Sequence, residues 1–126
     1  MLLAVSQEFG MEEDIKPEIA YCFAGGIGNT GSVCGAVAGA VMAIGLIRGR
    51  PDGMEEMFRT LGVAQEFRRR FEAEMETIAC RELTGIDLTT QEGIEQLMNS
   101  EVPMTVCFPA VALAYRLAVE VLQETS

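Results

Sequence analysis

The apolar segment from Val33 to Ile47 constrains the fold more than any other part of the chain. It carries Val, Ala, Ile and Leu all round, so as a helix it has no polar face to turn to water. The segment is shorter than the ~20 residues that a membrane span needs, and glycines interrupt it. It therefore predicts a buried, Gly/Ala-rich central helix that other helices cover.

Apolar residues recur at helical spacing along the rest of the chain, and no convincing strand or internal repeat is found. Further helices are expected over residues 2–9, 14–23, about 52–78, 89–98 and from 109 onward. The first of these has no capping residue, so it either begins at Met1 or has its first turn upstream of this sequence. We predict an all-α fold, with residues 1–126 forming one domain, a compact bundle of five or six helices.

The same periodicity predicts which face of each helix is buried and which residues cap it. Asp52 with Glu55, and Thr89 with Glu92, have the form of capping boxes, and Ser32 is the expected cap of the central helix. The expected buried faces are Ile15, Ile19, Cys22 and Phe23 in the second helix; Met54, Phe58, Leu61, Phe67, Phe71, Met75 and Ile78 in the long helix; and Phe108, Val111, Ala112, Tyr115, Val119 and Leu122 in the last.

Charge and composition exclude several classes of function. A net charge of −10 argues against binding to a nucleic-acid backbone or an anionic membrane surface. The basic run Arg68 to Arg70 is interpreted as a solvated helix face. The chain has no histidine, which excludes Ser-His and Cys-His couples, imidazole ligation and c-type haem attachment. No secretory signal or membrane span is visible, so a cytoplasmic location is expected.

The stretch Gly26 to Gly31 reads G-x-G-x-x-G and precedes a helix. A dinucleotide site also needs a strand before this motif and a second, parallel strand after the helix. The chain instead runs from Ile47 into Arg48 and Gly49 and on to another helix. Nucleotide binding is therefore disfavoured, whereas the loop and the following helix N-terminus retain the capacity to bind an anion or a cluster.

The four cysteines, Cys22, Cys34, Cys80 and Cys107, are the stronger chemical signal. They contain no C-x-x-C pair and no standard zinc or ferredoxin spacing, so shared chemistry requires the fold to bring distant thiols together. Cys22 lies on an apolar helix face, which favours a packing role. Cys34 and Cys107 are expected at or just before a helix N-terminus, which favours the thiolate, whereas Cys80 lies near a helix C-terminus.

One arrangement of these residues is familiar. Cys34-Gly35-Ala36-Val37-Ala38-Gly39 follows a Gly-rich loop; Cys80-Arg81-Glu82-Leu83-Thr84-Gly85 comes later, and Cys107 precedes the last helix. Over nearly its whole length the chain resembles the redox-active proteins named for a C…CGAxxG…C…C pattern. The resemblance implies redox activity and an iron–sulfur or other metal centre.

The resemblance also implies which residues form the site. Cys34, Cys80 and Cys107 match three of the four signature cysteines and would act as ligands or exchanging thiols. The family's first cysteine precedes the first apolar helix, and this sequence begins inside that helix. Gly35 and Gly39 lie four residues apart and leave a bare strip where a backbone or a cofactor can approach closely.

Two hypotheses about function follow. The first is a redox-active cysteine protein that binds an iron–sulfur or other metal centre through clustered thiolates and takes part in electron or thiol transfer with a redox partner protein. The alternative is a helical interaction module without catalytic activity, in which the cysteines are structural. The uncapped, apolar first helix is also compatible with self-association into a homo-oligomer.

Overall fold

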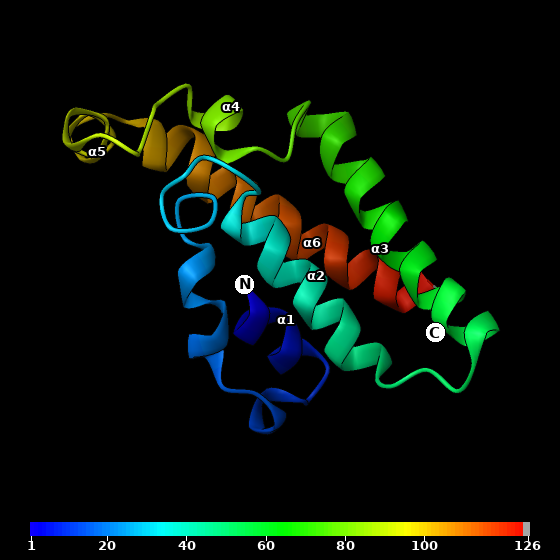
Figure 1. The fold of residues 1–126 in the computed structure, drawn as a ribbon. Helices are drawn as coiled ribbons and strands as arrows, with labels where there is room; N and C mark the ends of the chain where they lie inside the picture. The colour runs from blue at the N-terminus through cyan, green and yellow to red at the C-terminus, as the bar shows by residue number, and fades with distance from the viewer. Residues whose placement is uncertain (125–126) are drawn as a thin grey trace.

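The structure, a computed structural model, describes residues 1–124 as helices and connecting loops (Figure 1). Within this range no β-strand is present, and the β pairing is a single isolated bridge between Val33 and Ala79. The prediction of an all-α fold is confirmed.

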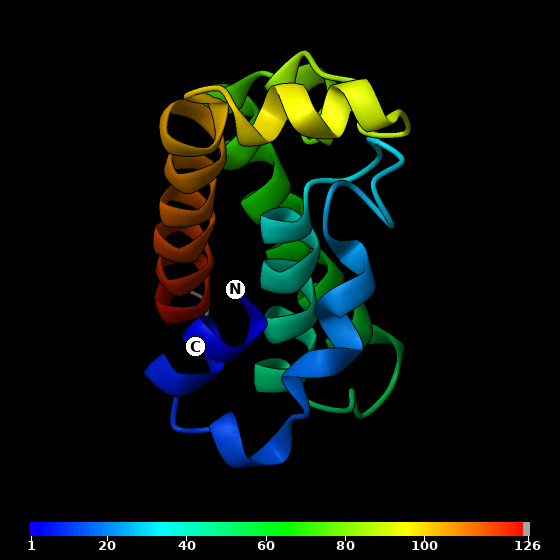
Figure 2. The same ribbon diagram turned by 90° about the vertical axis from the view of Figure 1, so that its left-hand side faces the viewer.

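The helical elements follow one another along the chain and pack into a core and an end cap. Helices α2, α3 and α6 contact one another, and α1 packs against α2 and α6 (Figure 1). Helices α4 and α5 and the start of the last helix gather at one end (Figure 2). The elements are α1 (Leu2–Glu8), η1 (Glu12–Asp14), η2 (Pro17–Phe23), α2 (Gly35–Arg48), α3 (Met54–Met75), α4 (Cys80–Thr84), α5 (Gln91–Met98), η3 (Pro103–Cys107) and α6 (Phe108–Glu124). The two elements η1 and η2 are 3-10 helices, and η3 is a π turn.

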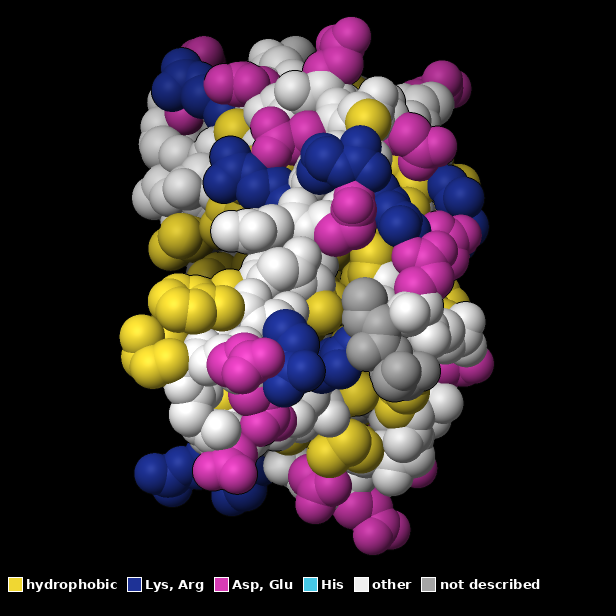
Figure 3. Space-filling view, turned by 90° about the vertical axis from the view of Figure 1, so that its right-hand side faces the viewer, with side chains coloured by type: hydrophobic (Ala, Val, Ile, Leu, Met, Phe, Trp, Pro, Cys, Tyr) yellow, Lys and Arg dark blue, Asp and Glu magenta, His cyan; other side chains and the backbone are white. Residues whose placement is uncertain are grey.

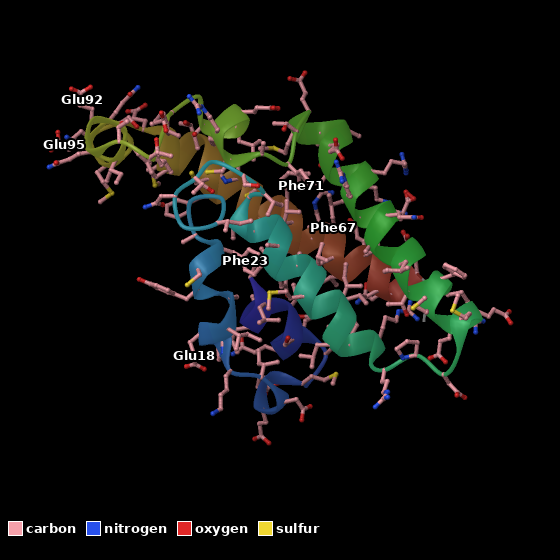
Figure 4. All side chains as sticks on the ribbon, in the orientation of Figure 1. Glu18, Phe23, Phe67, Phe71, Glu92 and Glu95 are labelled. Carbon is pink, nitrogen blue, oxygen red and sulfur yellow. The ribbon has the colours of Figure 1, made fainter. Side chains whose placement is uncertain are left out.

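Half of the residues of α2 are buried, all of them between Ala36 and Ile44, because small residues there let its neighbours approach, whereas Val41 is exposed. A Cβ atom added at Gly39 would lie 2.9 Å from Met1 Cβ and 3.1 Å from Leu2 N, so α1 is seated directly on this glycine. Phe67 and Phe71 of α3 point into the same core, with ring centroids 6.2 Å apart (Figure 4). The core is therefore built where α1, α3 and α6 meet on α2.

The second predicted helix is wrong in type. Lys16 is extended because it precedes Pro17, and the residues on either side form 3-10 turns rather than one α-helix. With three residues per turn, Ile19 and Cys22 share one face and Ala20 and Phe23 another. The first pair is exposed and the second is half-buried, so the predicted burial of Ile19 and Cys22 is wrong.

The long helix has the predicted amphipathic pattern, but only part of its apolar stripe is covered. Val63, Phe67 and Phe71 are buried, whereas Met54 and Phe58 near the helix start are exposed. Periodicity locates an apolar stripe without showing how much of its length has a neighbour. Asp52 is also not the cap: the N-cap is Gly53, and the Asp52 backbone N–H donates to Glu56 Oε2 at 2.9 Å.

The last helix buries a face that only partly matches the predicted one: of the six predicted residues, Leu122 is buried, Tyr115 and Val119 are half-buried, and the other three are exposed. Its buried residues are Ala110, Leu113, Ala114, Leu117, Ala118, Val121 and Leu122, whereas Phe108, Val111 and Ala112 are exposed. The helix is apolar around much of its circumference, so two faces satisfied the pattern. The alanine-containing face is the one that allows α2 and α3 to pack closely.

One helical stretch of residues 1–124, Pro103–Glu124, is long and apolar enough to cross a membrane on length and composition alone. Its C-terminal part, α6, packs against α1, α2 and α3. A core helix has the same appearance, so this stretch is weak evidence for a span.

The basic run on α3 is a surface feature, as predicted. Arg68 pairs with Glu72 and Arg69 with Glu66, while Arg70 reaches Glu124 of α6. Arginines and carboxylates alternate on this side of the molecule (Figure 3). The arginines therefore pair with carboxylates of the chain itself.

Ser6 of α1 provides a test of this core. Its hydroxyl is fully buried and has no hydrogen-bond partner in the structure. Ser6→Ala should raise the free energy of unfolding by about 1 kcal/mol, because it removes an unsatisfied polar group. Urea unfolding measures the change. Ser100→Ala is the matched control and should lower stability, because the Ser100 hydroxyl donates to Leu97 O and accepts from Val102 N. A loss of stability in Ser6→Ala would contradict the packing of α1.

Candidate functional site

A short backbone pairing joins the segment before α2 to the segment before α4. The Cys34 N–H donates to Ile78 O at 2.7 Å, and the Cys80 N–H donates to Ser32 O at 2.7 Å. These two bonds flank the bridge between Val33 and Ala79. Cys34 and Cys80 are 46 positions apart in the sequence, and each is the residue directly after one of the two bridged residues. Cys80 is the first residue of α4, so the prediction that it lies near a helix C-terminus is wrong.

The Gly-rich loop supports this pairing from one side. Its residues Gly25 to Asn29 all have positive φ, which makes a left-handed turn that glycine adopts without strain. The Ser32 N–H donates to Gly26 O at 2.9 Å and closes the loop onto the bridge. A Cβ atom at Gly26 would lie 2.7 Å from Cys80 Cβ and 2.6 Å from Ser32 N. The G-x-G-x-x-G pattern thus brings the chain against Cys80.

Cys34 is the N-cap residue of α2, and the predicted cap at Ser32 is wrong. The Cys34 carbonyl accepts the first helical bond, from the Ala38 N–H at 2.9 Å, and no side chain caps the helix. Cys34 thus lies at the helix N-terminus as predicted, one position before the first turn. The backbone N–H groups of that first turn face the same end of α2.

Cys107 lies just before the last helix, as predicted, but the residues that precede it are helical as well. It is the last residue of the π turn η3, which continues directly into α6. Pro109 lacks an N–H and so cannot complete the α-helical ladder at this point, and the Phe108 N–H bonds to Pro103 O five residues back. π turns occur frequently at functional sites, where they displace a side chain from its α-helical position.

Cys34, Cys80 and Cys107 line one pocket of about 200 Å³. Its lining contains no charged side chain, and the remaining residues are Gly25, Gly35, Ala36, Leu83, Thr84, Leu88, Leu97, Val106, Ala110 and Val111. The hydroxyl of Thr84 is committed to the Cys80 carbonyl at 2.9 Å. Three thiols from three distant segments therefore meet in a pocket that is otherwise almost wholly apolar.

This apolar setting acts on the thiols. Burial raises the pKa of the Cys80 thiol, and negative charge on Cys34 and Cys107 raises it further. Burial also raises the pKa of Cys107, with a second contribution from Cys34. The thiols thus influence one another across the pocket. Cys80 and Cys107 are protonated at neutral pH when no cation is bound.

The two glycines expected near a cofactor have separate positions. Gly35 lines the pocket, and a Cβ atom there would lie 3.1 Å from Phe23 O at the end of η2 (Figure 4). Gly39 is not among the pocket residues and instead seats α1 against α2. The sequence predicts that another backbone approaches both glycines closely. In the structure, the end of η2 approaches Gly35 and α1 approaches Gly39.

Cys22 takes no part in the pocket. It is exposed on η2, whereas the other three cysteines are half-buried. The expectation of a packed, core-facing Cys22 is wrong because η2 is a 3-10 helix. All four cysteines are free thiols.

The present side-chain positions do not form a metal centre. Among residues 1–124, no three Cys, Asp or Glu side chains are close enough together to hold one metal ion. The three pocket cysteines share a cavity without converging on one point. Shared ligation therefore requires their sulfur atoms to move inward.

The geometry defines a helical protein with a pocket of three thiols, and comparison with known proteins assigns it to a family. The sequence profile of the family described as "Putative redox-active protein (C_GCAxxG_C_C)" matches residues 1–121. The chain belongs to this family. Its central motif departs from the printed pattern in one respect, because the order Cys34-Gly35 replaces Gly-Cys. No curated protein matches the chain, and no solved structure does.

Sequence reasoning missed the residues that build the pocket around the cysteines. Gly26 and Gly31 leave room for Cys80 and Arg81, and Leu88 and Leu97 form apolar walls. The cluster of glycines with one fixed spacing was the available signal. Such a cluster allows close approach by a second segment of the same chain as well as by a phosphate.

Gly26 and Gly28 form a matched pair for testing how the loop supports Cys80. Gly26→Ala should lower the free energy of unfolding by about 2–4 kcal/mol, because the methyl group meets Ser32 and Cys80 and the φ of +73° disfavours alanine. Gly28→Ala, at φ +58° in open space, should cost about 1 kcal/mol. Urea unfolding measures both values. Equal costs would show that Gly26 contacts nothing important.

The order of thiol alkylation tests the pocket independently. In reduced, metal-free protein at pH 7.5, iodoacetamide should modify Cys22 first, since it is the exposed thiol. Cys80 and Cys107 should react last, because burial raises the pKa of both and lowers the thiolate fraction. Their rates should continue to rise with pH above about 8.5, the ordinary pKa of a thiol. Peptide mass spectrometry over a time course gives the order, and early labelling of Cys107 would contradict the pocket.

Proposed function

We propose that the protein is a redox-active cysteine protein in which Cys34, Cys80 and Cys107 together hold an iron–sulfur cluster or another redox-active metal. The observation that carries the proposal is the meeting of these three thiols in one pocket. Membership of a family described as redox-active supports it independently. The group would accept and release electrons, and a redox partner protein would exchange them.

The donor chemistry of the pocket fits such a group. Thiolates select iron–sulfur clusters, copper(I) and zinc, whereas magnesium and calcium require oxygen ligands. No carboxylate lines the pocket. Three protein ligands also leave one coordination position for an external ligand, as in metal sites that remain reactive. Leu88, Leu97 and Val111 are apolar lining residues that limit the access of water.

Disulfide exchange within the pocket is less well supported. Cys34 and Cys80 occupy diagonal positions across the backbone bridge, and such positions lie about 7–8 Å apart in an antiparallel pair. A disulfide needs Cα atoms about 4.4–6.8 Å apart, so closure would require the backbone to move. The raised pKa of Cys80 also weakens it as a nucleophile at neutral pH. A metal ion bridges a wider gap between sulfur atoms than a disulfide does.

Metal binding must displace protons from this pocket. Cys80 and Cys107 have raised pKa values and are protonated without metal, so ligation releases their protons and becomes stronger as pH rises. Because the thiols must remain reduced, we also propose a reducing compartment such as the cytoplasm.

Cysteine substitution tests the proposed function. Protein purified anaerobically, or reconstituted with iron and sulfide, should absorb in the visible range and contain bound iron. Cys34→Ser, Cys80→Ser and Cys107→Ser should each lower metal affinity at least tenfold, because each removes one thiolate ligand. Absorption spectroscopy and metal analysis give the loading.

Cys22→Ser is the matched control for these variants. It removes an exposed thiol that does not line the pocket, so loading should match that of the unmodified protein. Loss of loading in Cys22→Ser alone, or equal loading in all four variants, would contradict the proposed site. Equal loading would favour the helical interaction module with structural cysteines.

A further inference from the structure

Several large apolar side chains are exposed on the elements that line the thiol pocket, and we call this set the apolar patch. It consists of Ile94 and Met98 on α5, Met104 on η3, and Phe108 and Val111 on α6. Met98 is 74% exposed, Met104 66% and Phe108 58%. Exposed methionine and phenylalanine side chains are enriched in protein interfaces, where the flexible thioether adapts to its partner.

All three elements that carry the patch also line the pocket. On α5, Leu97 lines the pocket while the neighbouring Met98 is exposed. On the last helix, Val111 belongs to the pocket and to the patch. Phe108 and Val111 lie three residues apart on α6, so they share one helical face. A protein bound to this patch would therefore cover the thiol pocket.

The part of the chain that carries the patch is acidic. Between Glu82 and Tyr115 the chain has five carboxylates and no Lys or Arg: Glu82, Asp87, Glu92, Glu95 and Glu101. The nearest preceding cation, Arg81, lies 3.6 Å from Asp87, so these two charges offset each other and the negative charge comes from the other four carboxylates. Glu92 and Glu95 project outward from α5 (Figure 4). We call these four acidic side chains, Glu82, Glu92, Glu95 and Glu101, the acidic rim of the patch.

We propose that this apolar patch and its acidic rim are the docking surface for a basic redox partner protein, one with an apolar contact surface surrounded by Lys and Arg. The inference deepens the proposed function, because it specifies the partner of the thiol pocket. Charge complementarity identifies the occupant: the rim attracts a basic protein and orients it over the pocket. A second copy of this chain would bring two acidic rims together, and an anionic lipid surface would be repelled.

Binding of probe proteins tests the docking surface. The probe is cytochrome c, a small basic redox protein, and a plant-type ferredoxin serves as the acidic probe. Reduced protein treated with a chelator should bind cytochrome c at low ionic strength, and the Kd should increase as salt screens the charges. Ferredoxin should not bind. Isothermal titration calorimetry gives the Kd, and the chelator separates docking from metal loading, so either proposal can fail without the other.

Matched variants separate the patch from the net charge. The double variant Glu92→Lys/Glu95→Lys should weaken cytochrome c binding by about tenfold or more. The control Glu12→Lys/Glu13→Lys makes the same change in net charge on η1, at exposed positions outside the rim, and should change the Kd less than about twofold. Met104→Ser/Phe108→Ser should also weaken binding, because it removes apolar contact area.

Three results would overturn the proposal. Equal effects of the two charge reversals would show attraction by net charge alone. Binding of ferredoxin as tight as that of cytochrome c would remove the argument from charge. Sedimentation could show a dimer of this chain that the Phe108→Ser substitution dissociates. The patch would then be the interface with a second copy of the chain.

Discussion

The pairing of the backbone before α2 with the backbone before α4 is the constraint on which the pocket depends. Two hydrogen bonds of 2.7 Å fix Cys34 opposite Ile78 and Cys80 opposite Ser32. Without this pairing, the cysteines at the starts of two helices would have no fixed relation to each other. Cys107 then reaches the same pocket from the π turn η3, which contacts α4. The three pocket cysteines thus come from a stretch of more than seventy residues, and the two-residue bridge fixes two of them relative to each other.

The glycines are arranged around this constraint. Gly26 leaves room for Cys80, Gly31 for Arg81, and Gly35 for the carbonyl of Phe23. At each of these glycines, the space that a side chain would occupy is filled by backbone or side-chain atoms of another segment. The conformational cost of so many glycines is thereby offset by close packing at the pocket wall. The apolar interior that results raises the pKa of Cys80 and Cys107 and keeps both protonated until a cation displaces their protons.

Much of this arrangement was predictable from sequence, and the exceptions have physical reasons. Helical periodicity gave the all-α class, and the ordered motifs indicated which three cysteines belong together. Periodicity failed at Cys22, because a 3-10 helix turns every three residues and presents that thiol to solvent. Periodicity also failed in the last helix, because that helix has two apolar faces and the one that contains the alanines is the one that is buried. The bridge between Val33 and Ala79 has no signature in sequence, since backbone hydrogen bonds are available to every residue.

X-ray absorption at the metal edge of zinc-loaded Cys22→Ser protein tests most directly whether the three pocket cysteines form one ligand set. Cys34, Cys80 and Cys107 should contribute about three sulfur scatterers at roughly 2.3 Å, the usual zinc–thiolate distance. A first shell made mainly of oxygen or nitrogen, or one with a single sulfur, would contradict a shared thiol site.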